Sequence, residues 1–158
     1  MSNIAIVDYG MGNIGSIANM LKKVGVKSQT TGSPSELADA RKIILPGVGA
    51  FDNAMNKLNE LQFSEVIRNK AEKGTPILGI CLGMQLLGTS SEEGVLPGLN
   101  LIAAKIRKFQ TTGKLRVPHM GWNRVEAIDK EMYSNLEENK FYFVHSYYFD
   151  ADEESDIA

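Results

Sequence analysis

The single cysteine of this chain stands where a backbone bend could present a nucleophile. Residues 79–83 read Gly-Ile-Cys-Leu-Gly, and Cys81 directly follows a short apolar run that predicts a buried strand. A nucleophile between two glycines at a strand-to-helix turn sits in a strained bend, where neighbouring side chains would clash. Such a bend exposes the sulfur and sets the Leu82 N–H toward a developing oxyanion. The alternative is a small cysteine buried between strand and helix.

A second glycine-rich turn follows another predicted strand. Residues 46–49 read Pro-Gly-Val-Gly and come directly after the apolar run 42–45. The carboxyl ends of parallel strands meet at one edge of a sheet, where successive backbone N–H groups can converge on an anionic atom. Alone, the segment is also consistent with simple turn chemistry. Beside the Cys81 bend, it predicts a second oxyanion donor.

The two histidines are the candidate bases for a thiol nucleophile, which commonly needs a histidine held by a third group. His145 has the right type, but it lies in the aromatic run 141–148, which favours a packed and hydrogen-bonded histidine. His119 lies in segment 117–123, which is interpreted as a loop. Met120 and Trp122 of that segment are residue types found at partner interfaces if they are exposed, and core residues otherwise.

The first 90 residues alternate apolar strand runs with amphipathic helical runs. This order predicts an α/β fold with an open, mostly parallel sheet covered by helices on both faces, of the flavodoxin-like kind. Gly10, Gly12 and Gly15 match a dinucleotide fingerprint, but an acidic residue at the end of the second strand is missing, so segment 8–13 is interpreted as a ligand-facing or partner-facing loop. The predicted strands span 3–8, 26–30, 42–45 and 76–80, and the predicted helices span 14–24, a short stretch after 33, 51–58 and 63–71.

After Gly94 the pattern changes, because strand-like runs alternate with turns and helical periodicity is scarce. We expect an antiparallel extension of the main sheet in the C-terminal half. The whole chain, residues 1–158, is interpreted as a single domain. The expected strands of this half span 99–109, 114–118, 124–128 and 141–149.

Composition excludes several classes of protein. The 158 residues are 43% hydrophobic and 23% charged, which is typical of a globular domain. With 17 basic and 19 acidic residues, no positive field could hold nucleic acid or an anionic membrane. No apolar run reaches the roughly 20 residues of a membrane span, and no secretion signal is visible. One cysteine cannot form an internal disulfide, so we expect a cytoplasmic protein. We also expect no cofactor and no metal site.

Residues 79–85 (Gly-Ile-Cys-Leu-Gly-Met-Gln) resemble the nucleophile motif of class I, triad-type glutamine amidotransferases. Four further segments, 8–13, 46–51, 117–123 and 142–147, are similar to those of the glutaminase subunits of imidazole glycerol phosphate synthases. The resemblance covers essentially the whole chain. It implies hydrolysis of glutamine to glutamate and ammonia through a cysteine thioester. The ammonia would pass to a (β/α)8-barrel cyclase subunit that makes imidazole glycerol phosphate and aminoimidazole carboxamide ribonucleotide in histidine biosynthesis.

The same resemblance implies roles for individual residues. Cys81 would be the nucleophile, with the N–H groups of Val48 and Leu82 as the oxyanion hole. The residues that would hold the glutamine substrate are Gly49, Gln85 and Glu93. Those at or near the interface with the cyclase would be Asn13, Met120, Trp122, Tyr142 and His145.

The family's catalytic histidine, followed two residues later by a glutamate, matches neither His119 nor His145. We therefore expect the domain in residues 1–158 to lack its C-terminal segment, with the His-x-Glu motif after Ala158. Three alternatives stay open. One is a paralogous amidotransferase subunit for surface-polysaccharide sugars, suggested by Gly88-Thr89 and segment 94–98. Another is a non-catalytic interaction subunit, and a third is a cysteine hydrolase with His145 as its base.

Overall fold

The computed structural model describes residues 4–111, 116–126 and 139–151. Its main sheet has four parallel strands in the order β2-β1-β3-β4, as the alternation of strands and helices predicts. The strands are β1 (Ile4–Val7), β2 (Ser28–Thr31), β3 (Lys42–Gly47) and β4 (Ile77–Cys81). The helices are α1 (Ile14–Lys23), α2 (Pro34–Ala38), α3 (Phe51–Glu60), α4 (Phe63–Glu72) and α5 (Leu82–Gln85).

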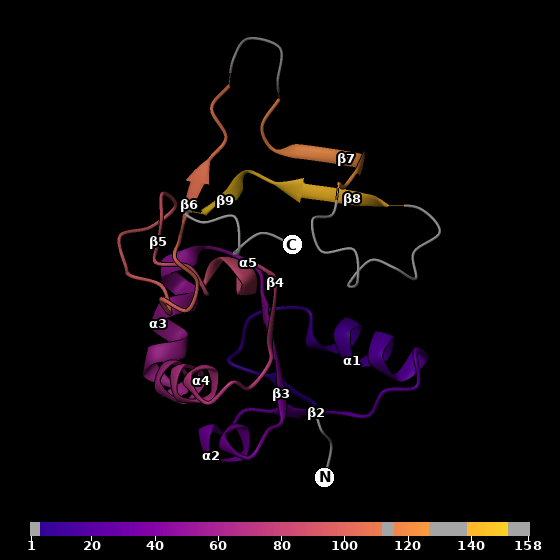
Figure 1. Ribbon diagram of the computed structural model, residues 1–158, viewed down its shortest axis with the longest axis vertical. Helices are drawn as coiled ribbons and strands as arrows, with labels where there is room; N and C mark the ends of the chain where they lie inside the picture. The colour runs from indigo at the N-terminus through magenta and orange to yellow at the C-terminus, as the bar shows by residue number, and fades with distance from the viewer. Residues whose placement is uncertain (1–3, 112–115, 127–138, 152–158) are drawn as a thin grey trace.

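Helices lie on both faces of this sheet, and the two faces are packed differently. Helix α1 covers one face, while α3 and α4 lie on the other (Figure 1). The core sits on the α3–α4 side, where their apolar residues pack onto β1 and β3. Its largest fully buried side chains include Tyr9, Phe51, Phe63, Leu45 and Ile67. The opposite face is looser, because no residue of α1 is fully buried within the described structure.

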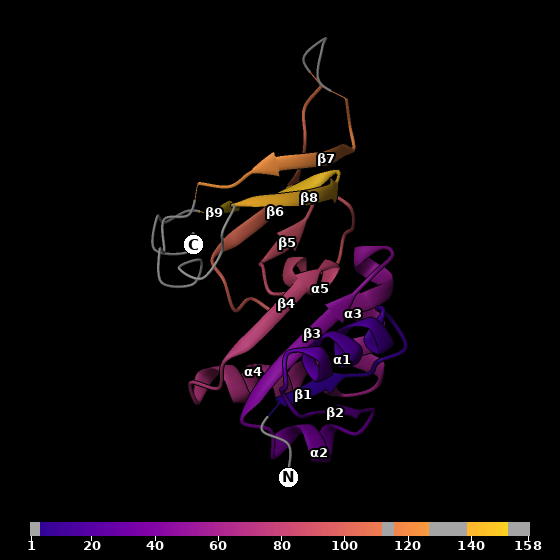
Figure 2. The ribbon, with the colours of Figure 1, turned by 90° about the vertical axis from the view of Figure 1, so that its right-hand side faces the viewer.

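The C-terminal half builds two smaller sheets at the carboxyl end of the main one (Figure 2). One has three strands in the order β5-β6-β9, with β6 and β9 antiparallel, and the other is an antiparallel ribbon of β7 and β8. These strands are β5 (Ser90–Ser91), β6 (Ala104–Lys108), β7 (His119–Arg124), β8 (Lys140–His145) and β9 (Tyr147–Ala151). The β6–β9 and β7–β8 pairs confirm antiparallel pairing in this half, and β5 pairs with β6 in parallel. The expected extension of the main sheet is wrong in one respect, because these strands form sheets of their own.

Several boundaries in this half differ from the prediction. Residues 99–103 are not in a strand, because the N–H groups of residues 99–102 bond to the carbonyls of residues 86–88, as Leu99 does to Leu86 at 2.8 Å. Segment 117–123, interpreted as a loop, supplies most of β7, since pairing with β8 outweighs its turn residues. The predicted strand 141–149 breaks at Ser146. The predicted strands 114–118 and 124–128 are wrong where the structure describes them, because residues 116–118 and 125–126 are not in a strand and Arg124 is the last residue of β7. Residues 114–115 and 127–128 lie outside the described residues.

Candidate active site

Cys81 lies in the strained bend that the sequence predicts. It is the last residue of β4 and the N-cap of α5, with φ 55° and ψ −119°, a conformation that L-residues rarely adopt. The residue is exposed and its thiol is free. The alternative of a buried cysteine is therefore wrong.

The glycines on either side of Cys81 let three backbone segments meet. A Cβ on Gly83 would overlap the carbonyl oxygen of Leu45 in β3, and one on Gly79 would overlap the backbone of Met84 in α5. Helix α5 therefore lies directly against the ends of β3 and β4. As the first helical residue, Leu82 has an N–H with no intrahelical acceptor.

The glycine-rich turn after β3 lies beside Cys81. Gly47 and Cys81 are register partners in the parallel β3–β4 ladder, so the next residue, Val48, leaves the sheet next to the sulfur-bearing residue. Val48 is 53% exposed, and Gly49 has φ +103°. The structure thus brings together both segments that the sequence proposes for an oxyanion hole.

The base of this turn is held by the loop that follows β1. The buried hydroxyl of Tyr9 donates to the carbonyl oxygen of Pro46 at 2.7 Å, and burial raises the pKa of Tyr9 above its ordinary value. A Cβ on Gly12 would lie 2.8 Å from the Pro46 Cβ. Asn13, the next residue, uses its side chain to cap α1 by accepting from the Ser16 N–H. Loop 9–13 therefore packs against the start of the turn.

Gln85 and Glu93 occupy different settings. The Oε1 atom of Gln85 is buried without a hydrogen-bond partner among the described residues, so it is an unsatisfied acceptor. Glu93 accepts the N–H of Phe51 at 3.0 Å through Oε2. Tyr147 is a neighbour that the sequence analysis missed. Its pKa is raised by burial and then by the negative charges of Glu93 and Glu92.

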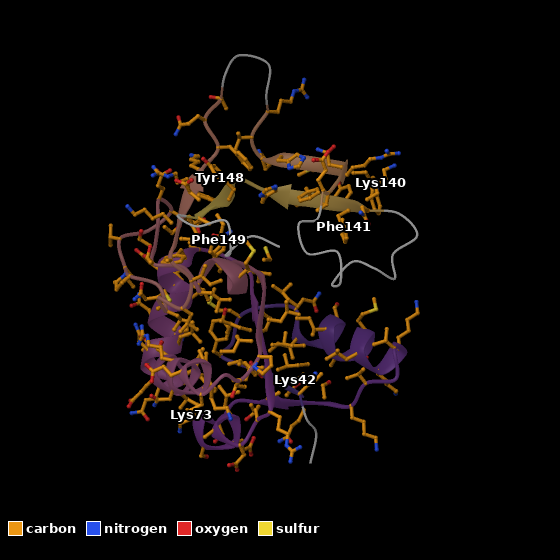
Figure 3. All side chains as sticks on the ribbon, in the orientation of Figure 1. Lys42, Lys73, Lys140, Phe141, Tyr148 and Phe149 are labelled. Atoms are coloured by element: carbon orange, nitrogen blue, oxygen red, sulfur yellow. The ribbon has the colours of Figure 1, made fainter. Side chains whose placement is uncertain are left out.

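The β7–β8 ribbon presents one apolar face to solvent. Strand alternation and register place Met120 opposite Val144 and Trp122 opposite Tyr142, and all four side chains are more than half exposed. The Trp122 and Tyr142 rings meet edge to face at 5.5 Å. In Figure 3 the start of β8, at Lys140 and Phe141, lies far from Lys42, which begins β3. The ribbon therefore stands on the side of the molecule toward which β3 and β4 run.

Both histidines lie on the other face of this ribbon and bond to each other. His145 Nδ1 must donate to the Tyr147 carbonyl oxygen at 2.8 Å, and in the matching tautomer its Nε2 accepts from His119 Nδ1 at 2.9 Å. His119 Nε2 then accepts from Asn123 Nδ2 at 3.0 Å. This confirms a packed, hydrogen-bonded His145. It also leaves that ring no free nitrogen for Cys81, which argues against His145 as a cysteine hydrolase's base.

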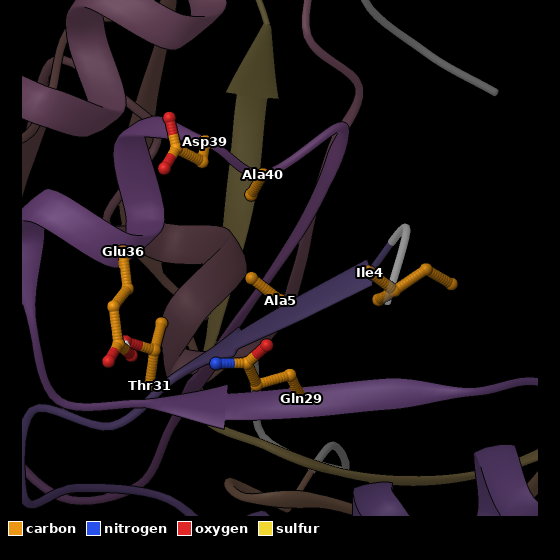
Figure 4. A pocket seen from close by; sticks show the side chains of 7 residues that line it. All are labelled: Ile4, Ala5, Gln29, Thr31, Glu36, Asp39 and Ala40. Carbon is orange, nitrogen blue, oxygen red and sulfur yellow. Dashed lines mark hydrogen bonds between the residues drawn. The ribbon is translucent and has the colours of Figure 1, made fainter. Parts of the chain in front are cut away.

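A cavity of about 230 Å³ lies between the start of β1, β2 and α2 (Figure 4). This cavity is not lined by Cys81 or by the glycine-rich turn after β3. It is lined by Ile4, Ala5, Gln29, Thr31, Glu36, Asp39 and Ala40. Within the described ranges, no three His, Cys, Asp or Glu side chains gather as a metal site requires. None of the described helices combines the length and hydrophobicity needed to cross a bilayer.

Comparison with known proteins places these features in a family context. The model of the class-I glutamine amidotransferase family matches residues 5–158. The imidazole glycerol phosphate synthase subunit HisH 2 of Methanococcus maripaludis is 50% identical over 98% of this chain and 78% of that protein. Subunit HisH of Leptospira interrogans is 44% identical over 98% of this chain and 78% of that protein. A crystal structure of a glutamine amidotransferase superposes with TM-score 0.73 at 17% identity, covering 96% of this chain and 76% of that one.

Proposed function

The chain belongs to the class-I glutamine amidotransferase family, and we propose that it is the glutaminase subunit of an imidazole glycerol phosphate synthase. It hydrolyses glutamine to glutamate and ammonia and delivers the ammonia to a cyclase subunit in histidine biosynthesis. The observation that carries this proposal is Cys81, which is exposed in a strained bend in register with Gly47. No cofactor takes part in these steps.

In the proposed mechanism, the Cys81 thiolate attacks the side-chain carbonyl carbon of glutamine. The carbonyl π electrons move to oxygen, and the N–H groups of Leu82 and Val48 stabilise the resulting oxyanion. Collapse of this tetrahedral intermediate breaks the C–N bond, and the leaving nitrogen takes a proton to depart as ammonia. Water then attacks the thioester, releases glutamate and restores the thiol.

In this proposal, the glutamine substrate is held by Gln85, Glu93 and Gly49. The unpaired Oε1 of Gln85 is an acceptor for substrate N–H groups, and the Glu93 carboxylate attracts the α-ammonium of glutamine. Gly49 lies in the turn after β3 and has a positive φ and no side chain. The substrate can therefore approach the backbone of this turn closely.

The general base is proposed to be the histidine of a His-x-Glu motif, because His119 and His145 use their ring nitrogens on each other, Asn123 and Tyr147. We propose that this motif follows Ala158 in the full-length gene product and completes the domain seen in residues 1–158. Intact mass measurement of that product tests this point, because a mass near 17.3 kDa would contradict it.

Ammonia transfer requires a closed contact with the cyclase, because free ammonia is largely protonated in neutral water and ammonium is not a nucleophile. The exposed apolar face of the ribbon, with Met120, Trp122 and Tyr142, is the proposed contact surface, together with Asn13. His145 supports this surface from the opposite face of the ribbon. The partner is proposed to be a (β/α)8 barrel.

We propose the cytoplasm as the compartment, since Cys81 must stay a reduced thiol.

The direct test of the proposed function measures glutamate release by the full-length protein alone and with the cyclase and its ligand. We expect weak activity alone and strong stimulation by the partner. Equal rates would argue against coupling. Growth of a histidine auxotroph carrying this gene separates the proposal from a subunit that serves surface-polysaccharide synthesis.

A further inference from the structure

Asp52, in the first turn of α3, holds a turn that is distant in sequence. The Val95 N–H donates to both carboxylate oxygens of Asp52, at 3.1 and 3.0 Å, and the Leu96 N–H donates to Oδ1 at 3.0 Å. Gly94 passes so close that a Cβ there would overlap the Asp52 carboxylate. Three charge-assisted hydrogen bonds therefore fix residues 93–96 against the start of α3.

A second hydrogen bond joins α3 to this turn, with a backbone N–H of the helix as the donor. Ala50 occupies the N-cap of α3 and has no side-chain oxygen to offer, so the helix lacks a cap of its own. Glu93 supplies one from 42 residues away, by accepting the Phe51 N–H through Oε2. The Glu93 N–H in turn donates to the Ser91 Oγ at 3.1 Å. Asp52 and Glu93 thus form a two-way clamp between α3 and turn 93–96.

This clamp determines which oxygen of Glu93 is left for a ligand. Oε2 is committed to the Phe51 N–H, while Oε1 has no hydrogen-bond partner among the described residues. Helix α3 also begins directly after the 47–49 turn that lies next to Cys81. The clamp therefore ties the Glu93 carboxylate to the segment that borders the nucleophile.

We propose that Asp52 is a positioning residue of the glutamine site, an inference that rests on the proposed glutaminase function. By holding turn 93–96, Asp52 keeps the Glu93 Oε1 turned toward the α-ammonium of the substrate. Asp52 itself touches no reacting atom. Its loss should weaken recognition of the ammonium and leave the chemistry of the thiol unchanged.

The test compares two reagents that alkylate Cys81 in the full-length protein. A diazo-ketone analogue of glutamine carries the α-ammonium, whereas iodoacetamide does not. In Asp52→Asn, which keeps the shape but loses the charge and one acceptor oxygen, we expect diazo-ketone labelling to slow by roughly tenfold. Iodoacetamide labelling should stay within about twofold of the wild type. The KM for glutamine should rise by the same roughly tenfold factor, with kcat nearly unchanged.

A second variant attacks the same bonds from the other side. Val95→Pro removes the N–H that both Asp52 oxygens accept and leaves α3 intact, and it should give the same selective loss. Asn53→Ala, at an exposed neighbouring position in α3, is the matched control and should behave as the wild type. Equal slowing of both reagents, or no slowing in either clamp variant, would overturn the role of Asp52. A wild-type protein that iodoacetamide labels and the diazo-ketone does not would instead overturn the glutaminase function itself.

Discussion

Gly47 and Cys81 are register partners at the carboxyl ends of β3 and β4. The turn after Gly47 and the helix after Cys81 therefore start side by side, although the two residues lie 34 positions apart in the sequence. This arrangement follows from the parallel pairing of β3 and β4, because the backbone leaves both strands at the same edge of the sheet. The same relationship allows one backbone N–H from each segment to face a single oxygen atom.

The strain at Cys81 predicts a trade between stability and activity. A non-glycine residue in this conformation costs about 1–3 kcal/mol. Cys81→Gly should therefore abolish glutamine hydrolysis and raise the free energy of unfolding by about 1 kcal/mol. Cys81→Ala is the control, because it also removes the sulfur but keeps the Cβ and the strain. Denaturant unfolding of both variants checks this, and equal stabilities would contradict it.

Close packing at Gly83 predicts a strong effect of one methyl group. Gly83→Ala places a Cβ against the Leu45 carbonyl oxygen, and α5 must shift to relieve the overlap. We expect a loss of about 3 kcal/mol or more in unfolding free energy, together with loss of activity. Gly15→Ala is the matched control in α1, where a Cβ meets no atom within 4 Å. That variant should gain about 0.5–1 kcal/mol, and similar effects of both changes would refute the packing argument.

The hydroxyl of Tyr9 predicts a pH effect and a mutational effect. Tyr9→Phe leaves the buried Pro46 carbonyl unpaired and should cost about 1–3 kcal/mol. Burial raises the pKa of Tyr9, so its contribution is complete below the unfolded-state pKa of about 10 and declines as the pH rises above that value. The free energy of unfolding, measured at pH values from about 8 to about 11, should fall more steeply with rising pH for the wild type than for Tyr9→Phe. Parallel curves would be inconsistent with this role.

The exposed ribbon predicts a separable effect on assembly. Trp122→Ala removes a large exposed side chain that packs on Tyr142, and we expect the affinity for the cyclase to fall by about 2 kcal/mol. Glutamate release without the cyclase should be unchanged. Leu61→Ala changes an exposed apolar residue in the turn between α3 and α4 and serves as the control. Titration calorimetry measures both affinities, and an equal loss in the control would contradict a ribbon-centred interface.

Local patterns were sufficient for the parallel half of the fold. Short apolar runs followed within three residues by glycine predict β3 and β4 with their turns, because buried parallel strands and sharp exits have strong local signatures. The bend at Cys81 follows from the same signatures, since only small flanking residues allow it. These residues therefore could be placed from the sequence before any tertiary contact was considered.

Contacts between distant residues determine what the sequence could not predict. His119 lies in a segment rich in turn residues, yet pairing with His145 makes it part of a strand. The bonds of Asp52 to Val95 and Leu96 span more than 40 residues and leave no local signal. Tyr147 reaches the Glu93 region only because β9 folds back on β6. Such features depend on tertiary pairing, which a single sequence does not display.

The covalent step at Cys81 can be tested directly by acid quench of the full-length protein, with cyclase and cyclase ligand present, during turnover of glutamine. Peptide mass spectrometry should find one glutamyl group on the peptide that contains Cys81, and no such adduct in Cys81→Ala. The contradictory result is steady hydrolysis of glutamine with an unmodified Cys81 and undiminished activity in the alanine variant.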